Sequence, residues 1–183
     1  LYLTEYINEN NFIFPKTIWD DFPFNLSVIR DVERVVVSSK RYYHFIRARA
    51  ESETTKHVSA MYQKREEEHQ WLITLYEYWG IDDENSREFL ARRYVERIIG
   101  CVENVTNKNC TLTNKEKKQK IRQMIFDQKV KESLQTARPN SLMMKIMLLP
   151  IKWRNVNLTY LEGKLISLAK SNIKLFSTLK AKR

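Results

Sequence analysis

Glycine and proline are scarce in this chain, whose 183 residues include 3 Gly and 4 Pro. Turn-rich all-β proteins need more of both, so this scarcity favours long helices. No run of about 18 apolar residues occurs, and we therefore expect no helix to span a bilayer. Two cysteines, Cys101 and Cys110, exclude a disulfide scaffold, and no signal peptide is visible. These absences predict a cytoplasmic protein. The first residue is Leu1 rather than Met, so we expect further sequence upstream.

Motifs that bind phosphate or metal are also missing. The three glycines do not cluster, which excludes a Gly-rich phosphate loop, and no Asp-x-Asp triplet occurs. His44, His57 and His69 have no metal-ligand spacing to a cysteine or an acid, so we interpret each as structural. The sequence therefore predicts no metal site within this chain.

The charge is distributed unevenly between the two halves of the chain. Residues 1–90 carry 11 basic and 16 acidic side chains, whereas residues 91–183 carry 21 basic and 6 acidic ones. The whole chain has a net charge of +10. A positive charge confined to one half indicates a basic face with an anionic partner. No nucleic-acid recognition motif accompanies it, so we expect no nucleic acid as partner.

The C-terminal region combines basic and apolar residues. Residues 139–183 contain nine Lys or Arg against one acid, Glu162, with apolar side chains between them. This pattern is typical of a helix that lies in a membrane interface, where each basic residue near an anionic leaflet contributes roughly 1 kcal/mol. The alternative is an apolar stripe packed on the protein, on the missing upstream half or on a second subunit of a homo-oligomer.

Helical spacing dominates after residue 55. A helix is predicted between Thr55 and Trp79, with Gly80 as its C-terminal cap. Asp83 can cap the next helix, whose apolar stripe runs from Leu90 to Val102. We predict a loop over residues 104–109 and a capping box from Thr113 to Glu116 that starts a helix ending near residue 136. Two basic amphipathic helices, over 141–149 and 156–180, are predicted to be separated near Pro150.

The first 55 residues indicate mixed α and β structure. Residues 1–10 and 25–33 suit short helices, and residues 18–24 suit a loop. Residues 11–15, 35–37 and 41–47 are aromatic or β-branched and suit strands. The sequence therefore predicts an α-rich α+β fold.

Asp20 and Asp21 form an acidic pair on the predicted loop, flanked by Trp19, Phe22 and Phe24. Packing against these aromatic side chains would desolvate the carboxylates, as suits a general base. The alternative is that one of the two acids only caps the following helix.

Arg47 and Arg49 bracket the end of the third predicted strand, and Ser52 and Thr54 follow. Arginine together with hydroxyl groups can bind a phosphate or pyrophosphate. Ordinary surface charge at a strand end is the alternative, and the residues by themselves favour it.

The order of segments at the N-terminus carries a resemblance. These segments are Leu1-Tyr2, Ile7–Pro15, Trp19–Phe24 and Tyr42–Ser52. They resemble one stretch of the bacterial family 2 glycosyltransferases of capsule and cell-wall polysaccharide synthesis. Those enzymes show a Lys-Leu-Tyr start, an Asn-x-x-Phe-Pro segment, a Glu-Asp pair, and an aromatic strand that ends in Arg. The resemblance covers the first third of the chain closely and the helical remainder loosely.

The resemblance implies a GT-A fold that binds a sugar nucleotide and a divalent metal, Mg or Mn. It implies that Asp21 is the general base that takes a proton from the acceptor hydroxyl, with inversion at the anomeric carbon. Asp20 stands where the family has Glu, and Trp19, Arg47 and Arg49 become acceptor-side or supporting residues. The acceptor would be a polysaccharide or a lipid-linked saccharide at the cytoplasmic face of the membrane.

The nucleotide-binding half of the family and its Asp-x-Asp metal motif both precede the point that Leu1 matches. We therefore expect residues 1–55 to be the acceptor-side end of a GT-A domain and residues 56–183 to be a basic helical domain. The upstream half is an expected partner, and this chain alone is expected to bind no donor or metal and to be inactive. The competing hypothesis is a non-enzymatic helical interaction module whose basic face binds an anionic membrane or a partner protein.

Overall fold

The structure is a computed structural model, and it describes residues 2–17, 19–40 and 57–171. The chain divides into two compact units. One comprises Leu1–Thr55 and Glu66–Asp82, and the other comprises Lys56–Arg65 and Asp83–Arg183. The first unit thus contains the predicted acceptor-side segment together with most of one long helix.

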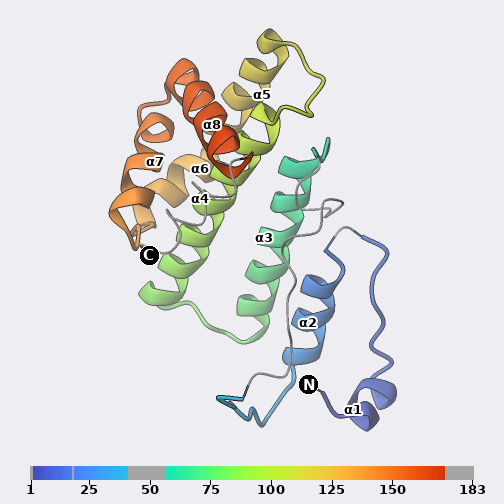
Figure 1. The fold of residues 1–183 in the computed structure, drawn as a ribbon. Helices are drawn as coiled ribbons and strands as arrows, with labels where there is room; N and C mark the ends of the chain where they lie inside the picture. The colour runs from blue at the N-terminus through green and yellow to red at the C-terminus, as the bar shows by residue number, and fades with distance from the viewer. Residues whose placement is uncertain (1, 18, 41–56, 172–183) are drawn as a thin grey trace. The chain divides into compact units, whose positions relative to one another are not determined.

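Eight helices are found in the described part of the chain, and Figure 1 shows them in sequence order. They are α1 (Thr4–Glu9), α2 (Asp21–Ile29), α3 (Met61–Tyr78), α4 (Glu84–Thr106), α5 (Asn114–Phe126), α6 (Gln128–Thr136), α7 (Leu142–Lys152) and α8 (Val156–Ser171). The prediction of a helical protein is therefore confirmed.

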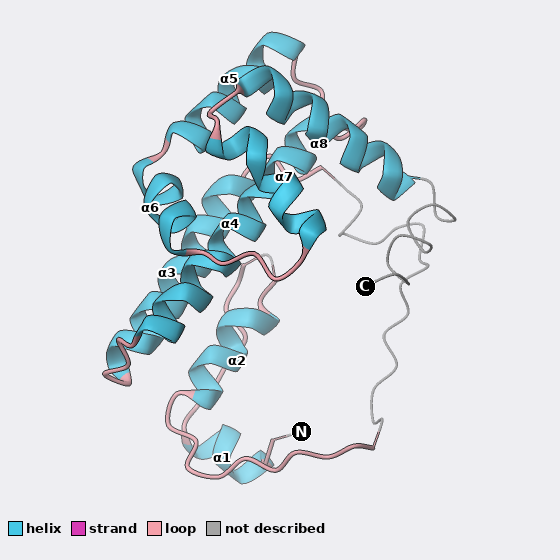
Figure 2. Cartoon of the chain, turned by 90° about the vertical axis from the view of Figure 1, so that its left-hand side faces the viewer, coloured by secondary structure: helices cyan, strands magenta, loops and turns pink. Residues whose placement is uncertain are grey.

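The strands predicted near the N-terminus are not formed by the residues that the structure describes, as Figure 2 shows. Residues 12–15 and 35–37 form neither helix nor strand, and the strand predicted over 41–47 lies outside the described residues. Val35, Val36 and Val37 are 78%, 91% and 92% exposed. A strand needs a neighbour to pair its backbone groups, and no strand among the described residues pairs with this run, so the α+β prediction is not supported.

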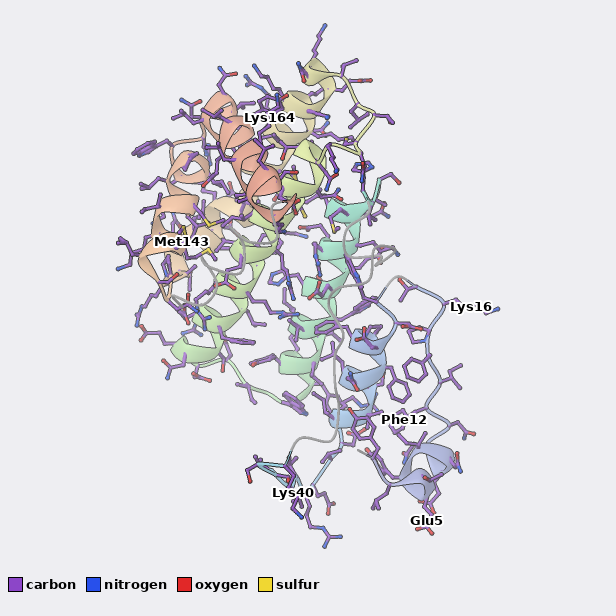
Figure 3. All side chains as sticks on the ribbon, viewed as in Figure 1. Glu5, Phe12, Lys16, Lys40, Met143 and Lys164 are labelled. Atoms are coloured by element: carbon purple, nitrogen blue, oxygen red, sulfur yellow. The ribbon has the colours of Figure 1, made fainter. Side chains whose placement is uncertain are left out.

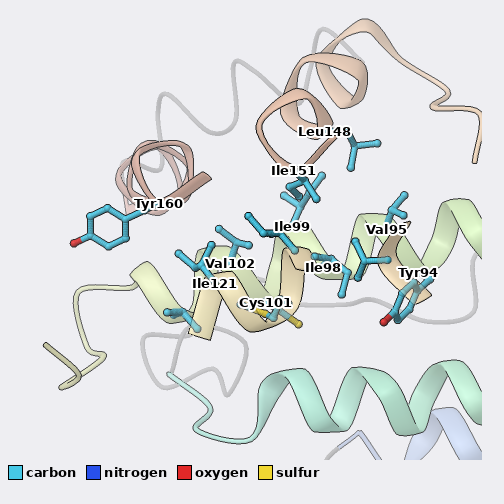
Figure 4. Packing of buried hydrophobic residues seen from close by; sticks show 14 of the residues in the cluster. Tyr94, Val95, Ile98, Ile99, Cys101, Val102, Ile121, Leu148, Ile151 and Tyr160 are labelled. Atoms are coloured by element: carbon cyan, nitrogen blue, oxygen red, sulfur yellow. The ribbon is translucent and has the colours of Figure 1, made fainter. Parts of the chain in front are cut away.

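Helix α4 is the centre of the second unit, because α5, α6, α7 and α8 all pack against it. Its buried face contains Tyr94, Val95, Ile98, Ile99 and Val102 of the predicted stripe, whereas Leu90, where that stripe begins, is half-buried. Figure 4 shows them meeting residues of the surrounding helices, among them Ile121, Leu148, Ile151 and Tyr160. Each fully buried aliphatic side chain of this kind contributes about 1.5–3 kcal/mol.

Several predicted helix ends are confirmed. Gly80 has a φ of 64° beyond the end of α3. The Asp83 side chain accepts hydrogen bonds from the backbone N–H groups of Asn85 and Ser86. Thr113 and Glu116 form the reciprocal capping box at the start of α5. These ends are local in sequence. Asp83 and Thr113 cap backbone groups within three residues of themselves, and the end of α3 depends on the positive φ that Gly80 adopts without strain.

Other predicted boundaries are wrong. Helix α4 continues to Thr106 and so includes the first residues of the loop predicted over 104–109. The contacts of buried Asn104 account for this difference. Its side chain accepts a 2.9 Å hydrogen bond from the Val58 N–H and donates one of 2.9 Å to the Val58 carbonyl. The predicted helix after Thr113 is interrupted at Asp127, whose side chain caps α6. Helix α7 also runs through Pro150 and ends at Lys152 instead of stopping before the proline.

Candidate functional site

The predicted acidic pair lies at the start of α2. Asp20 precedes the helix and Asp21 is its first residue, so the predicted loop ends earlier than expected. Trp19 has a φ of 58°, which a bulky non-glycine residue adopts at a cost in backbone strain. The strained residue turns the chain into the helix directly before the two carboxylates.

Both carboxylates are exposed, whereas Trp19 is half-buried. The Asp20 side chain makes no capping hydrogen bond, and its backbone carbonyl instead accepts from the Phe24 N–H. The helix start therefore does not use the Asp20 carboxylate, which remains available to a ligand. The expectation that aromatic neighbours bury the pair is not met.

The aromatic side chains around the pair pack on one another. Phe14 and Phe24 stack with ring centroids 3.9 Å apart, and Tyr2 meets the same Phe24 edge to face. Phe22 lies 6.5 Å from Trp71 of α3, between centroids. Phe24 and Val28 are buried, so these contacts anchor the inner face of α2. The result is a rigid support under an exposed acidic turn.

The end of α2 carries a polar cluster that the sequence analysis did not find. Arg30 donates a 2.8 Å hydrogen bond to Asp31, and the Tyr78 hydroxyl donates one of 2.7 Å to the other oxygen of the same carboxylate. The Trp79 indole N–H donates to the Arg30 carbonyl, 2.7 Å away. Tyr78 and Asp31 are 47 residues apart and Trp79 and Arg30 are 49 apart, so no local pattern reveals the contacts that join the two helix ends.

The electrostatics of this cluster favour an ionised Asp31. The hydrogen bonds from Arg30 and then from Tyr78 lower the pKa of the Asp31 carboxyl, and the Asp31 carboxylate in turn raises the pKa of the Tyr78 phenol. All three groups are exposed and each has its partners within the cluster. We interpret it as a junction that ties the end of α2 to the end of α3.

Arg47 and Arg49 lie outside the described residues, so the structure does not place them relative to Asp21. Among the residues that are described, no three His, Cys, Asp or Glu side chains converge as a metal site would require. A cavity of about 60 Å³ in the second unit is lined by Tyr62, Asn104 and Lys120, among others. Ligand pockets for small molecules measure about 300–1,000 Å³, so this cavity is far too small for a nucleotide sugar.

Helices α7 and α8 present apolar side chains to solvent. On α7 these are Leu142, Met143, Ile146, Leu149 and Trp153 directly after it, and on α8 they are Leu158, Leu161, Leu165 and Leu168. Figure 3 labels Met143 on the first helix and Lys164 on the second. Lys145 and Lys152 are exposed on α7 as well. The apolar residues that the sequence placed in this region thus divide between the core and the surface.

Across the described ranges, no helix has both the length and the apolar character needed to cross a membrane.

Comparison of the chain with family models, with curated proteins and with solved structures found no match.

Proposed function

We propose that this chain is the acceptor-side end and the helical C-terminal domain of a family 2-like glycosyltransferase. The observation that carries the proposal is the exposed acidic turn at Asp20 and Asp21, held beside half-buried Trp19 on an aromatic support. A general base must be within about 3 Å of the hydroxyl it deprotonates, so it must be reachable by the acceptor. An exposed carboxylate at a rigid helix start meets this requirement.

In the proposed reaction Asp21 takes the proton from an acceptor hydroxyl while its oxygen attacks the anomeric carbon of the donor sugar. The bond from that carbon to the nucleotide phosphate breaks, and the configuration inverts. Asp20 and Trp19 orient the acceptor, because an indole face packs well against the apolar face of a sugar ring. The divalent metal and the nucleotide would be held by the upstream half, and the metal would supply charge neutralisation for the departing phosphate.

The α+β part of the proposal rests on residue type at Val35–Val37, which form no strand in the structure. Three consecutive β-branched residues that are almost fully exposed suit a strand whose partner is elsewhere. In the proposed enzyme the upstream half supplies that partner. The protein then works at the cytoplasmic face of the membrane on a polysaccharide or lipid-linked acceptor.

The test is made in the enzyme that includes the upstream half. Asp21→Asn should reduce turnover by about two to four orders of magnitude while donor binding is kept, which is the usual scale for losing a general base. Glu9→Gln is the matched control, since Glu9 is an exposed acid of the same unit at the end of α1, and it should leave turnover unchanged. Near-normal turnover of Asp21→Asn contradicts the proposal.

The chain alone should bind no donor. Titration calorimetry with common sugar nucleotides and Mn²⁺ is expected to show no saturable heat. Micromolar binding would mean that the donor site lies within this chain, and the proposed division between the two halves would be wrong.

A second candidate function is docking on an anionic membrane surface through α7, as an interaction module. The observation that favours it is the exposed apolar face of α7 with Lys145 and Lys152 on the same helix. Such a helix binds by apolar insertion and by attraction to anionic lipid. The affinity should fall steeply with salt, because the Debye length shrinks from about 10 Å at 0.1 M to about 3 Å at 1 M.

Co-sedimentation with anionic and with neutral vesicles tests this docking. Replacing Lys145 and Lys152 with Gln should weaken sedimentation with anionic vesicles. The same charge change at Lys115 and Lys131, which are exposed on α5 and α6, is the control. Lys170 is a poor choice for such a variant because it forms a 2.7 Å ion pair with Glu103. Equal sedimentation with both vesicle types would exclude electrostatic docking.

A further inference from the structure

The cavity of the second unit has hydrogen-bond donors on more than one side. Its volume is about 60 Å³, and its lining comes from the start of α3, from α4 and from α5. The polar residues that line it are Ser59, Tyr62, Asn104, Lys120 and Gln123, and no Asp or Glu is among the described residues that do so. One water molecule needs about 10–15 Å³ of such space, so a group of several atoms fits. We call this space the basic cavity.

Three polar side chains of the basic cavity have no partner in the described ranges. Ser59, Lys120 and Gln123 make neither a hydrogen bond nor an ion pair there through their side chains. All three residues are exposed, so a ligand can reach them from solvent. A hydroxyl, an ammonium and an amide that line one space suit a ligand rich in acceptor atoms.

Two acids beside these residues already have partners. Asp127 accepts a 3.1 Å hydrogen bond from the Tyr62 hydroxyl. Glu116 lies one turn before Lys120 on α5, and its Oε2 atom accepts 2.7 Å hydrogen bonds from the backbone N–H and the hydroxyl of Thr113. Neither acid forms an ion pair with Lys120. The ammonium charge of Lys120 is therefore not neutralised by the described part of the chain.

Asn104 gives the basic cavity a buried and fixed polar wall. Its side chain is held from both ends by the backbone of Val58, as described above, and the residue is only 5% exposed. A side-chain amide has two N–H groups, and the Val58 carbonyl accepts one of them. The other N–H is available to a ligand, at a position that the two hydrogen bonds to Val58 fix.

His57 reports a positive electrostatic potential at this place. Burial, and then the ammonium groups of Lys117 and Lys120, lower the pKa of the His57 imidazole. Lys117 and Lys120 lie one turn apart on α5, and Lys120 also lines the basic cavity. An anion held there would reduce the repulsion among these basic groups, whereas a cation would increase it.

We propose that the basic cavity binds a terminal phosphate group, either inorganic phosphate or the phosphate of a monoester. The Lys120 ammonium supplies the charge, and Ser59, Gln123 and Asn104 donate to the phosphate oxygens. Because the donors come from three segments of the chain, they suit a tetrahedral oxyanion better than a planar carboxylate.

This inference is independent of the proposed function. A nucleotide sugar has no terminal phosphate, because a sugar and a nucleoside occupy the two ends of its diphosphate. The basic cavity is also too small for such a molecule. Binding of phosphate by this chain therefore does not conflict with the absence of donor binding expected above, and each result can fail without the other.

Titration calorimetry of the 183-residue chain at constant ionic strength measures the binding. Inorganic phosphate and glycerol phosphate are titrated separately, and at least one of them should saturate below about 10 mM. If only inorganic phosphate binds, the ligand is the free ion. If glycerol phosphate binds as well, the site also accepts a monoester. The absence of saturable binding by both compounds would overturn the proposal.

Lys120→Gln locates the site. It should weaken phosphate binding by about ten-fold or more, the loss expected for one charge-assisted hydrogen bond. Lys115→Gln is the matched control, because Lys115 is also exposed on α5 but does not line the basic cavity, and it should leave the affinity unchanged. Unchanged far-ultraviolet circular dichroism shows that both variants are folded. An equal loss in both variants would mean that the ion is attracted only by the general positive charge of the chain, and the proposal would be wrong.

The His57 imidazole provides a second measurement. Bound phosphate should raise the pKa of His57, because its negative charge opposes the effect of Lys117 and Lys120. The pH dependence of the imidazole proton signals with and without phosphate measures this change, and His57→Gln assigns the signals. A His57 pKa that does not change in a chain that binds phosphate would place the ion elsewhere and overturn the assignment to the basic cavity.

Discussion

Gly163 sets how closely α8 approaches α4, and Gly163→Ala tests that contact. A Cβ at this position would lie 2.7 Å from the Thr106 Oγ1, 2.8 Å from the Val102 Cγ1 and 3.0 Å from the Thr106 Cγ2. Both neighbours are buried and β-branched, so they have little rotamer freedom. The Thr106 hydroxyl is also held by hydrogen bonds to the Val102 and Glu103 carbonyls. The new methyl group can therefore be accommodated only if the two helices separate.

Two opposing effects determine the magnitude. Overpacking a well-packed core costs about 1–3 kcal/mol, whereas replacing Gly by Ala inside a helix gains about 1 kcal/mol. The net result for Gly163→Ala is a loss of about 1 kcal/mol. Gly100 is the matched control, because it also lies within a helix and a Cβ there would meet no atom within 4 Å. Gly100→Ala should therefore gain up to about 1 kcal/mol.

Urea denaturation followed by far-ultraviolet circular dichroism measures both variants. The two substitutions are chemically identical, so the difference in their free energies of unfolding isolates the contact with α4. Thr106→Ala removes two of the three crowding atoms, and combining it with Gly163→Ala should recover part of the loss. If Gly163→Ala is as stabilising as Gly100→Ala, the inference that α8 packs closely against α4 at Gly163 is wrong.

Two further predictions concern buried or half-buried polar groups. Asn104→Ala should cost about 1–3 kcal/mol in free energy of unfolding, because it leaves the Val58 N–H and carbonyl without their partner. Burial raises the pKa of the Glu162 carboxyl to about 7. Between the ordinary carboxyl pKa and about 7, the folded chain therefore holds a proton that the unfolded chain has released. The contribution of Glu162 protonation to the free energy of unfolding is complete below the ordinary carboxyl pKa and is lost as pH rises to about 7. Glu162→Gln should flatten this dependence in urea titrations.

Each of these predictions has a control. The control for Asn104→Ala is Asn109→Ala, because Asn109 is exposed, and it should change the free energy of unfolding much less. Asn155→Ala is unsuitable as a control because Asn155 caps the start of α8. For Glu162 the control is Glu77→Gln on α3, which is exposed and should preserve the wild-type pH dependence. A pH profile of Glu162→Gln parallel to that of the wild type would refute the assignment.

Local signals in the sequence determined most helices and their ends. The stripe of α4, the capping side chains of Asp83 and Thr113, and the glycine after α3 were all predicted, because each depends on residues within a turn or two of one another. The helix at the acidic pair is an exception, because α2 begins at Asp21 and not at Asn25 as predicted. What Asp20 and Asp21 do remains a prediction from resemblance.

Tertiary structure decided what no local pattern contains. The sequence did not reveal that Asn104 would hold Val58 and extend α4, or that Asp31 would meet Tyr78, since those partners are more than forty residues apart. The sequence also did not determine which apolar stripe is buried against other helices and which is exposed. The same Leu and Ile residues suit a core or a surface, and only the packing of α8 on α4 through Gly163 turns Leu161 and Leu165 outward. Residue type determines what a side chain can bury, and the neighbouring elements decide whether it is buried.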